Sequence, residues 1–194
     1  MATTDERLEL NDPRQMRALA HPLRLRLLGA LRIDGPATAT ALAEEVGESP
    51  ALVSYHLRTL AKHGFVQEDP SLARDGRERW WRASHPGMTW EPVRFLDTPE
   101  RAAAANALLS VIVERYAEAA REWLADAGNW HEDWVEVADM SDWRLRLSSA
   151  QALRMRDELY EVIERYERMA PEDGAEQVRT IVEVLPHRAK RGRR

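Results

Sequence analysis

The chain has 194 residues, of which 44% are hydrophobic and 31% charged, with a formal net charge of −5. These values are typical of one globular domain, or of one small domain with an extension, and they exclude wholesale disorder. The chain has no cysteine, which excludes disulfides, thiol catalysis and thiolate metal sites. The longest nearly apolar run, 102–113, is too short to cross a bilayer, and the first residues lack the pattern of an export signal. We therefore expect a cytoplasmic protein that does not contact a membrane.

The charge is distributed unevenly along the chain. Residues 12–82 contain 11 Lys or Arg against 9 Asp or Glu, whereas residues 83–185 contain 11 against 21. The negative net charge therefore arises from the second half, and it hides a more basic first half.

The first third of the sequence predicts four short helices. Asp12-Pro13 and Ser49-Pro50 each place a capping side chain before a proline suited to the first helical turn. Thr38 or Thr40 can cap the third helix, and Gly47 suits the left-handed turn that closes it. The predicted helices cover roughly residues 13–20, 22–33, 38–46 and 50–63. The last two, joined by a tight turn, predict a helix-turn-helix.

A β-hairpin is predicted directly after these helices. Residues 65–68 and 78–82 alternate with a period of two, and the stretch between them is rich in turn-forming residues. Three arginines lie near the tip of this hairpin, where they suit a minor groove: Arg74, Arg77 and Arg79. Ordinary solvation of a loop is the alternative. Helices followed by such a hairpin form a winged helix.

The helix over 50–63 separates into two faces on a helical wheel. Val53, Leu57 and Leu60 fall together and are expected to pack inward. The opposite face combines small residues with hydrogen-bond donors: Ala51, Ser54, Tyr55, Arg58 and Lys62. We expect this face to read double-stranded DNA, Arg58 by contacting guanine and Lys62 by contacting the backbone. The helix start at Ser49 and Pro50 can offer N–H groups to a phosphate.

The same region resembles a known family. The runs Ala20-His-Pro-Leu-Arg-Leu-Arg-Leu-Leu28 and Ser49-Pro-Ala-Leu-Val-Ser-Tyr-His-Leu-Arg-Thr-Leu60, followed by Lys62-His-Gly-Phe-Val66, look like the winged helix of ArsR/SmtB-type bacterial transcription regulators. The resemblance covers residues 10–83. It implies a homodimeric repressor on an inverted-repeat operator, with the helix opened by Ser49 in the major groove and the wing on flanking DNA.

The metal sensors of that family carry cysteines or an Asp/His/Glu set on a terminal dimer helix. This chain has no cysteine, and residues 98–127 contain no histidine. The resemblance is therefore to a branch without a metal site and with an additional C-terminal domain. We expect no cofactor.

Residues 84–97 are expected to be an irregular linker, and residues 98–127 a long helix. One apolar stripe runs along that helix: Ala105, Leu108, Leu109, Ile112, Tyr116, Ala119 and Trp123. We expect this stripe to form the contact between the two subunits. Packing against the chain's own C-terminal unit is the alternative.

Residues 128–186 predict a strand, helix and strand, at 143–147, 149–169 and 178–185. Indole side chains concentrate around this unit, and they suggest either a pocket for a small-molecule effector or ordinary core and interface packing: Trp90, Trp123, Trp130, Trp134 and Trp143. The basic tail over 187–194 either attracts phosphates or only solubilises the end of the chain.

The predicted fold class is α+β, with an N-terminal winged helix, a long helix and a small β-α-β unit. No nucleophile–base pair, phosphate-binding glycine loop or zinc-binding HExxH pattern occurs, so we expect no catalytic residues and no enzyme activity. The predicted function is sequence-specific binding of DNA for the regulation of transcription. A winged helix that binds another protein instead is the alternative.

Overall fold

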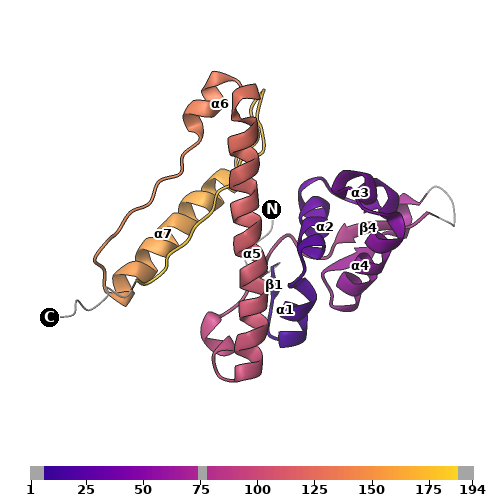
Figure 1. Ribbon diagram of the computed structural model, residues 1–194, viewed down its shortest axis with the longest axis horizontal. Coiled ribbons are helices and arrows are strands. Elements are labelled where there is room, and N and C mark those ends of the chain that lie inside the picture. The colour runs from indigo at the N-terminus through magenta and orange to yellow at the C-terminus, as the bar shows by residue number, and fades with distance from the viewer. Residues whose placement is uncertain (1–6, 74–77, 188–194) are drawn as a thin grey trace. The chain divides into compact units, whose positions relative to one another are not determined.

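The computed structural model describes residues 7–73 and 78–187 (Figure 1). The chain divides into two compact units, one within residues 2–125 and one from residue 126 onward. In the described part, no helix is long and apolar enough to cross a membrane. The predicted α+β class is confirmed, because helices and short strands together build the first unit.

Four helices begin the first unit, at the positions that the capping signals predict. They are α1 (Pro13–Leu19), α2 (Pro22–Ile33), α3 (Ala39–Val46) and α4 (Pro50–Lys62). The side chains of Asp12, His21, Thr38 and Ser49 each accept a hydrogen bond from a backbone N–H of the helix that follows. Of the two candidates for the cap of α3, the structure uses Thr38. Gly47 closes α3 at φ 70°, a backbone conformation that favours glycine.

A three-stranded antiparallel sheet completes the winged helix. Its strands are β2 (Ala37–Thr38), β3 (Val66–Glu68) and β4 (Trp80–Ala83), in the order β2-β4-β3. The expected hairpin is present as β3 and β4, joined through a short 3-10 helix, η2 (Pro70–Leu72). The third strand, β2, has only two residues, and its pairing with β4 brings Ala37 opposite Trp81.

Residues 84–97 differ from the linker that the sequence suggests. They contain β5 (Met88–Thr89), which pairs in parallel with β1 (Leu8–Glu9), and a 3-10 helix, η3 (Pro92–Phe95). Phe95 is only 2% exposed and belongs to the main hydrophobic core. This segment is therefore an integral part of the first unit.

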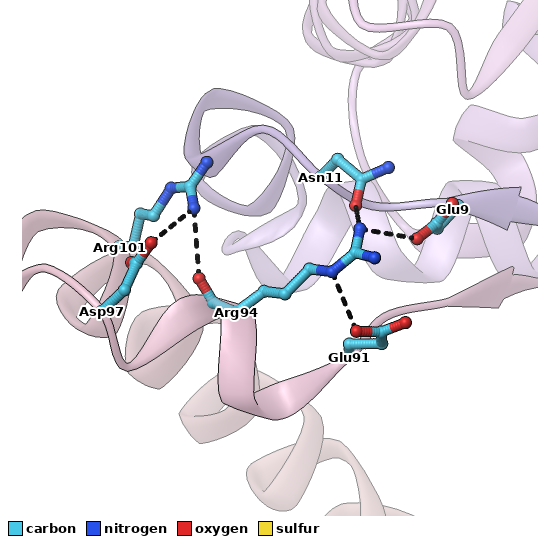
Figure 2. Close-up of polar contacts among 6 residues, drawn as sticks. All are labelled: Glu9, Asn11, Glu91, Arg94, Asp97 and Arg101. Atoms are coloured by element: carbon cyan, nitrogen blue, oxygen red, sulfur yellow. Dashed lines mark hydrogen bonds and ion pairs between the residues drawn. The ribbon is translucent and has the colours of Figure 1, made fainter.

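Arg94 connects this segment to residues 9–11 through hydrogen bonds and an ion pair (Figure 2). Its Nη1 donates to Glu9 at 3.3 Å and to Asn11 at 3.4 Å, and its Nε lies 2.8 Å from a carboxylate oxygen of Glu91. Arg101 donates to the carbonyl oxygen of Arg94 at 3.2 Å and pairs with Asp97 at 2.9 Å. Each exposed ion pair contributes little alone, but the network links β1, η3 and the start of the next helix.

The long helix α5 (Pro99–Asp126) spans nearly the predicted range. Its first half packs into the core of the first unit through Ala104, Ala105 and Leu108. The other core residues come from α1 to α4 and the sheet, among them Leu27, Leu57 and Phe65. One apolar core thus holds the helix-turn-helix and the start of α5.

The second unit contains η4 (Ala127–Asn129), α6 (Glu132–Val137) and α7 (Ser149–Glu167). The predicted helix is confirmed, and Ser148 and Gln151 form a capping box at its start. The strands predicted at 143–147 and 178–185 are not formed: both segments lack ladder hydrogen bonds. Alternation of apolar residues is not sufficient for a strand, because the backbone also needs a pairing partner.

Candidate nucleic-acid interface

Helix α4 is held on the first unit by one apolar face. Val53, Leu57 and Leu60 are fully buried and belong to the core that also contains residues of α2 and α3. The inward face that the helical wheel predicts is therefore confirmed. Gly64, at φ 80°, ends the helix, and the N–H of Phe65 donates to the carbonyl oxygen of Leu60 at 3.0 Å.

The opposite face of α4 is open to solvent. Ala51, Tyr55, Arg58 and Lys62 are exposed, and Ser54 is half-buried. Tyr55 has an exposed fraction of 59%. The structure thus places all five residues of the predicted outer face away from the core, on one rigid helix.

Arg58 and Lys62 are the cations of this face. Within residues 7–73 and 78–187, neither side chain forms a hydrogen bond or an ion pair, whereas the side chains of nearby arginines of the hairpin do. A cation without an intramolecular carboxylate keeps its full charge for an external anion. These two side chains therefore give the outer face of α4 a positive charge that is not neutralised internally.

The start of α4 offers fewer N–H groups than an uncapped helix. The hydroxyl of Ser49 accepts from the N–H of Leu52 at 3.3 Å, and Pro50 has no N–H. Of the first turn, at most the N–H of Ala51 is left for a phosphate. The predicted contribution of the helix start to phosphate binding is therefore small.

The hairpin contributes one described arginine of the three that the sequence singles out. Arg79 is exposed and pairs with Glu68 on the neighbouring strand at 3.3 Å. Arg74 and Arg77 lie outside the described residues. Arg82 pairs with Asp69 at 3.3 Å, which anchors the base of the hairpin. A contact of Arg79 with DNA thus requires that it exchange an exposed carboxylate for a phosphate.

Beneath α4 lies a contact between His21 and His56, two histidines whose positions in the sequence indicate capping or packing but not that they meet. His56 is only 4% exposed, and its ring centroid is 4.5 Å from that of His21. Nδ1 of His21 accepts from the N–H of Leu23 at 3.2 Å and so caps α2. The signal was present in the sequence, because His56 lies three residues after Val53 and four before Leu60, on the buried face.

Burial lowers the pKa of both imidazoles. Arg24 lowers the pKa of each further, His21 adds to the effect on His56, and Glu48 acts in the opposite direction on His56. Both rings are therefore neutral in the folded protein at neutral pH.

The apolar stripe predicted on the long helix is divided by the structure. Ala105 and Leu108 lie in the chain's own core, and Ile112 packs partly against it, so these residues are covered without a partner. Leu109 and Val113 are exposed, and Tyr116, Ala119 and Trp123 are half-buried. The buried part of the stripe thus packs on the N-terminal unit and not on the C-terminal unit that the sequence suggested, and the subunit contact stays a prediction.

The tryptophans considered for an effector pocket belong to both units. Trp130 and Trp134 are in edge-to-face contact, with ring centroids 6.4 Å apart, and the indole N–H of Trp130 donates to Asp126 at 3.1 Å. Trp143 is 75% exposed. Trp90 packs against the core of the first unit. A groove between α2 and α5 is lined largely by charged residues, among them Arg26 and Glu114, and by none of these tryptophans.

The comparison with family models agrees with the helix-turn-helix of the first unit. A family model described as a helix-turn-helix domain matches residues 19–68. No curated protein matches the chain. Similar solved structures include a mutant of ZitR from Lactococcus lactis in apo form, at 14% identity, covering 76% of this chain and 83% of that chain, with a TM-score of 0.33.

Two others are a MepR mutant from S. aureus bound to an oligodeoxyribonucleotide and the adhesin competence repressor AdcR from Streptococcus pyogenes. Both are 16% identical to this chain, with TM-scores of 0.28 and 0.27. The first covers 77% of this chain and 78% of that chain, and the second covers 78% and 81%. The matched family model and the observed elements agree that this chain carries an N-terminal helix-turn-helix domain within a mixed helix-and-sheet fold.

Proposed function

We propose that this protein regulates transcription by binding specific sites in double-stranded DNA, with α4 in the major groove. The observation that carries the proposal is the outer face of α4, where Arg58 and Lys62 are exposed and unneutralised while the opposite face is fully buried. Small residues at Ala51 and Ser54 allow the helix to approach base edges closely. Arg58 supplies the bidentate donor that recognises guanine, and Lys62 supplies charge for the backbone.

The proposed active species is a homodimer that represses transcription from an inverted-repeat operator. Two copies of α4 then read half-sites about one helical turn apart, roughly 34 Å. The exposed residues Leu109 and Val113 on α5 offer an apolar contact for the second copy. Acidic side chains on α3, such as Glu44 and Glu45, are exposed and unsuited to phosphate, so α4 and the hairpin carry the contact.

A small-molecule effector that binds near Trp130 and Trp134 stays a prediction. The contact between these two rings supplies an apolar wall, and Asp126 orients one of them. Fluorescence of the tryptophans during a titration with candidate compounds tests it directly.

The function is tested by selecting bound fragments from a genomic DNA library and footprinting the selected site. We expect saturable binding to a limited set of sites that survives an excess of random competitor, with protection of two symmetric half-sites. Binding that disappears equally with any competitor contradicts the proposal. In that case the alternative, a winged helix that binds another protein, is tested by crosslinking with the same purified protein.

A further inference from the structure

The contact between His21 and His56 connects the start of α2 with the middle of α4. His21 is the residue that caps the start of α2, and His56 is in the middle of α4. Their ring centroids are 4.5 Å apart with the planes tilted by 44°. The contact therefore links the start of α2 to the helix that carries Arg58.

The surroundings of Nδ1 in both imidazoles disfavour a proton on that atom. Nδ1 of His21 accepts a hydrogen bond from the N–H of Leu23 at 3.2 Å, which a protonated Nδ1 cannot do. Nδ1 of His56 is buried without a hydrogen-bond partner among the described residues. A proton on that atom would place an unpaired N–H and a charge in the interior.

The groups around the pair oppose a positive charge. Arg24, from α2, interacts electrostatically with both rings, and its own Nε is buried without a hydrogen-bond partner among the described residues. Tyr55 lies with its ring centroid 5.2 Å from that of His56. Glu48, in the turn before α4, is the one acidic group that acts on His56. The single carboxylate of Glu48 is therefore opposed by Arg24 and by the second imidazole once that ring is protonated.

We propose that His21 and His56 are positioning residues that hold α4 on α2 only while both rings are neutral, so that specific DNA binding weakens on acidification. Protonation removes the cap of α2, introduces repulsion with Arg24 and separates the two rings. This inference rests on the proposed function, because its main readout is binding to an operator. It adds a control of that binding by pH that does not involve any residue of the outer face.

The direction of the effect distinguishes this role from simple electrostatics. Added positive charge on a DNA-binding protein strengthens its attraction to phosphates, so acidification alone raises affinity. Loss of the neutral pair instead lowers affinity, because α4 is displaced from the orientation that reads base edges. The two explanations therefore predict opposite changes of DNA affinity with pH.

The experiment measures affinity for the selected operator by fluorescence anisotropy from pH 8.0 to pH 5.5 at constant ionic strength. We expect the wild type to lose at least about tenfold in affinity over this range, the change that one pKa unit represents in an equilibrium. His21→Asn keeps an acceptor for the N–H of Leu23 and cannot titrate, so its loss is expected to be threefold or less. An additional His56→Gln substitution is expected to abolish the dependence.

His131→Asn is the matched control, because His131 also caps a short helix through Nδ1 but is exposed. This variant is expected to keep the wild-type pH profile. A wild-type affinity that stays constant or rises on acidification overturns the proposal, as does an unchanged profile in His21→Asn.

Hydrogen exchange of the α4 amides without DNA separates this inference from the proposed function. We expect protection factors in α4 to fall between pH 7.5 and pH 5.5 in the wild type and to change less in His21→Asn. If the protein binds no operator at any pH but shows this loss of protection, the DNA-binding function is wrong and the positioning role stands. Protection that does not change with pH overturns the positioning role.

Discussion

Gly29 of α2 and Arg115 of α5 lie in direct contact. A Cβ added at Gly29 would lie 3.0 Å from Nη2 of Arg115, which is tighter than nine in ten such contacts in proteins. The absence of a side chain at Gly29 thus allows the guanidinium of Arg115 to lie against α2. Glycine in a helix interior costs about 0.5–1 kcal/mol relative to alanine, and this contact offers a reason for accepting that cost.

A double-mutant cycle tests that relationship. In the Arg115→Ala background, Gly29→Ala is expected to stabilise the protein by about 0.5–1 kcal/mol, because only the helix propensity changes. In the wild-type background the gain is expected to be smaller, since the arginine must move. Chemical denaturation of the wild type, the two single variants and the double variant gives the coupling free energy between the two residues. Equal effects of Gly29→Ala in both backgrounds contradict the contact.

Arg58→Ala is expected to reduce operator affinity by about 1–3 kcal/mol and to relax selectivity at one base position, because a bidentate contact with guanine is lost. Competition between the operator and its single-base variants measures both effects. Arg154→Ala, which removes an exposed arginine of α7, is the matched control and is expected to leave the affinity unchanged. A uniform loss across all sequences would instead assign Arg58 to the backbone.

Lys62→Ala is expected to act differently, because Lys62 is assigned to a phosphate. The logarithm of affinity falls with the logarithm of salt concentration at about 0.9 per phosphate neutralised, so the slope is expected to become shallower by about that amount. The order of preference among operator variants should be retained. A slope equal to that of the wild type would show that Lys62 does not contact the backbone.

The stability of the protein is expected to fall as the pH drops below about 6.5, the pKa of an unperturbed histidine. Because burial lowers the pKa of His21 and His56 in the folded state, the unfolded chain takes up protons first on acidification. The stabilisation that the neutral pair provides is thus fully present above about pH 6.5. It is lost as the pH falls through the lowered pKa values of His21 and His56 in the folded protein. Thermal unfolding between pH 8 and pH 5 measures it, and His56→Gln should show a weaker dependence.

The exposed side of α5 is tested with Leu109→Asp combined with Val113→Asp. Two charges at a subunit contact are expected to produce monomers in sizing with light scattering, since burial of an unpaired carboxylate is costly. Val137→Asp, on the exposed surface of α6, is the control and should leave the mass unchanged. A double variant that stays dimeric places the interface elsewhere.

The parts of the fold that local signals control were predictable. The orientation of α4 follows from the spacing of Val53, Leu57 and Leu60, and its start follows from Ser49-Pro50. The same pattern placed Arg58 and Lys62 on the outer face. These features depend on residues within one or two helical turns of each other, which is the range over which periodicity is informative.

Features that depend on distant residues were not predictable. The pairing of Leu8 with Met88 joins two-residue strands that are far apart in the sequence, and Arg94 finds its partners Glu9 and Asn11 in the same distant segment. Conversely, residues 143–147 alternate like a strand but lack the neighbour that would make them one. A local pattern carries no information about whether such a neighbour exists.

The pairing of β1 with β5 and the burial of Phe95 also affect how this protein is made. When residue 83 is added to the growing chain, helices α1 to α4 and both strands of the hairpin are complete in sequence, but the strand β5 that pairs with β1 and the ring of Phe95 are still to be synthesised. A fragment cut at that point would keep α4 but would lose Phe95 from the core and the backbone hydrogen bond from Leu10 to Thr89. Any minimal domain prepared for crystallisation or NMR should therefore extend at least through Leu108.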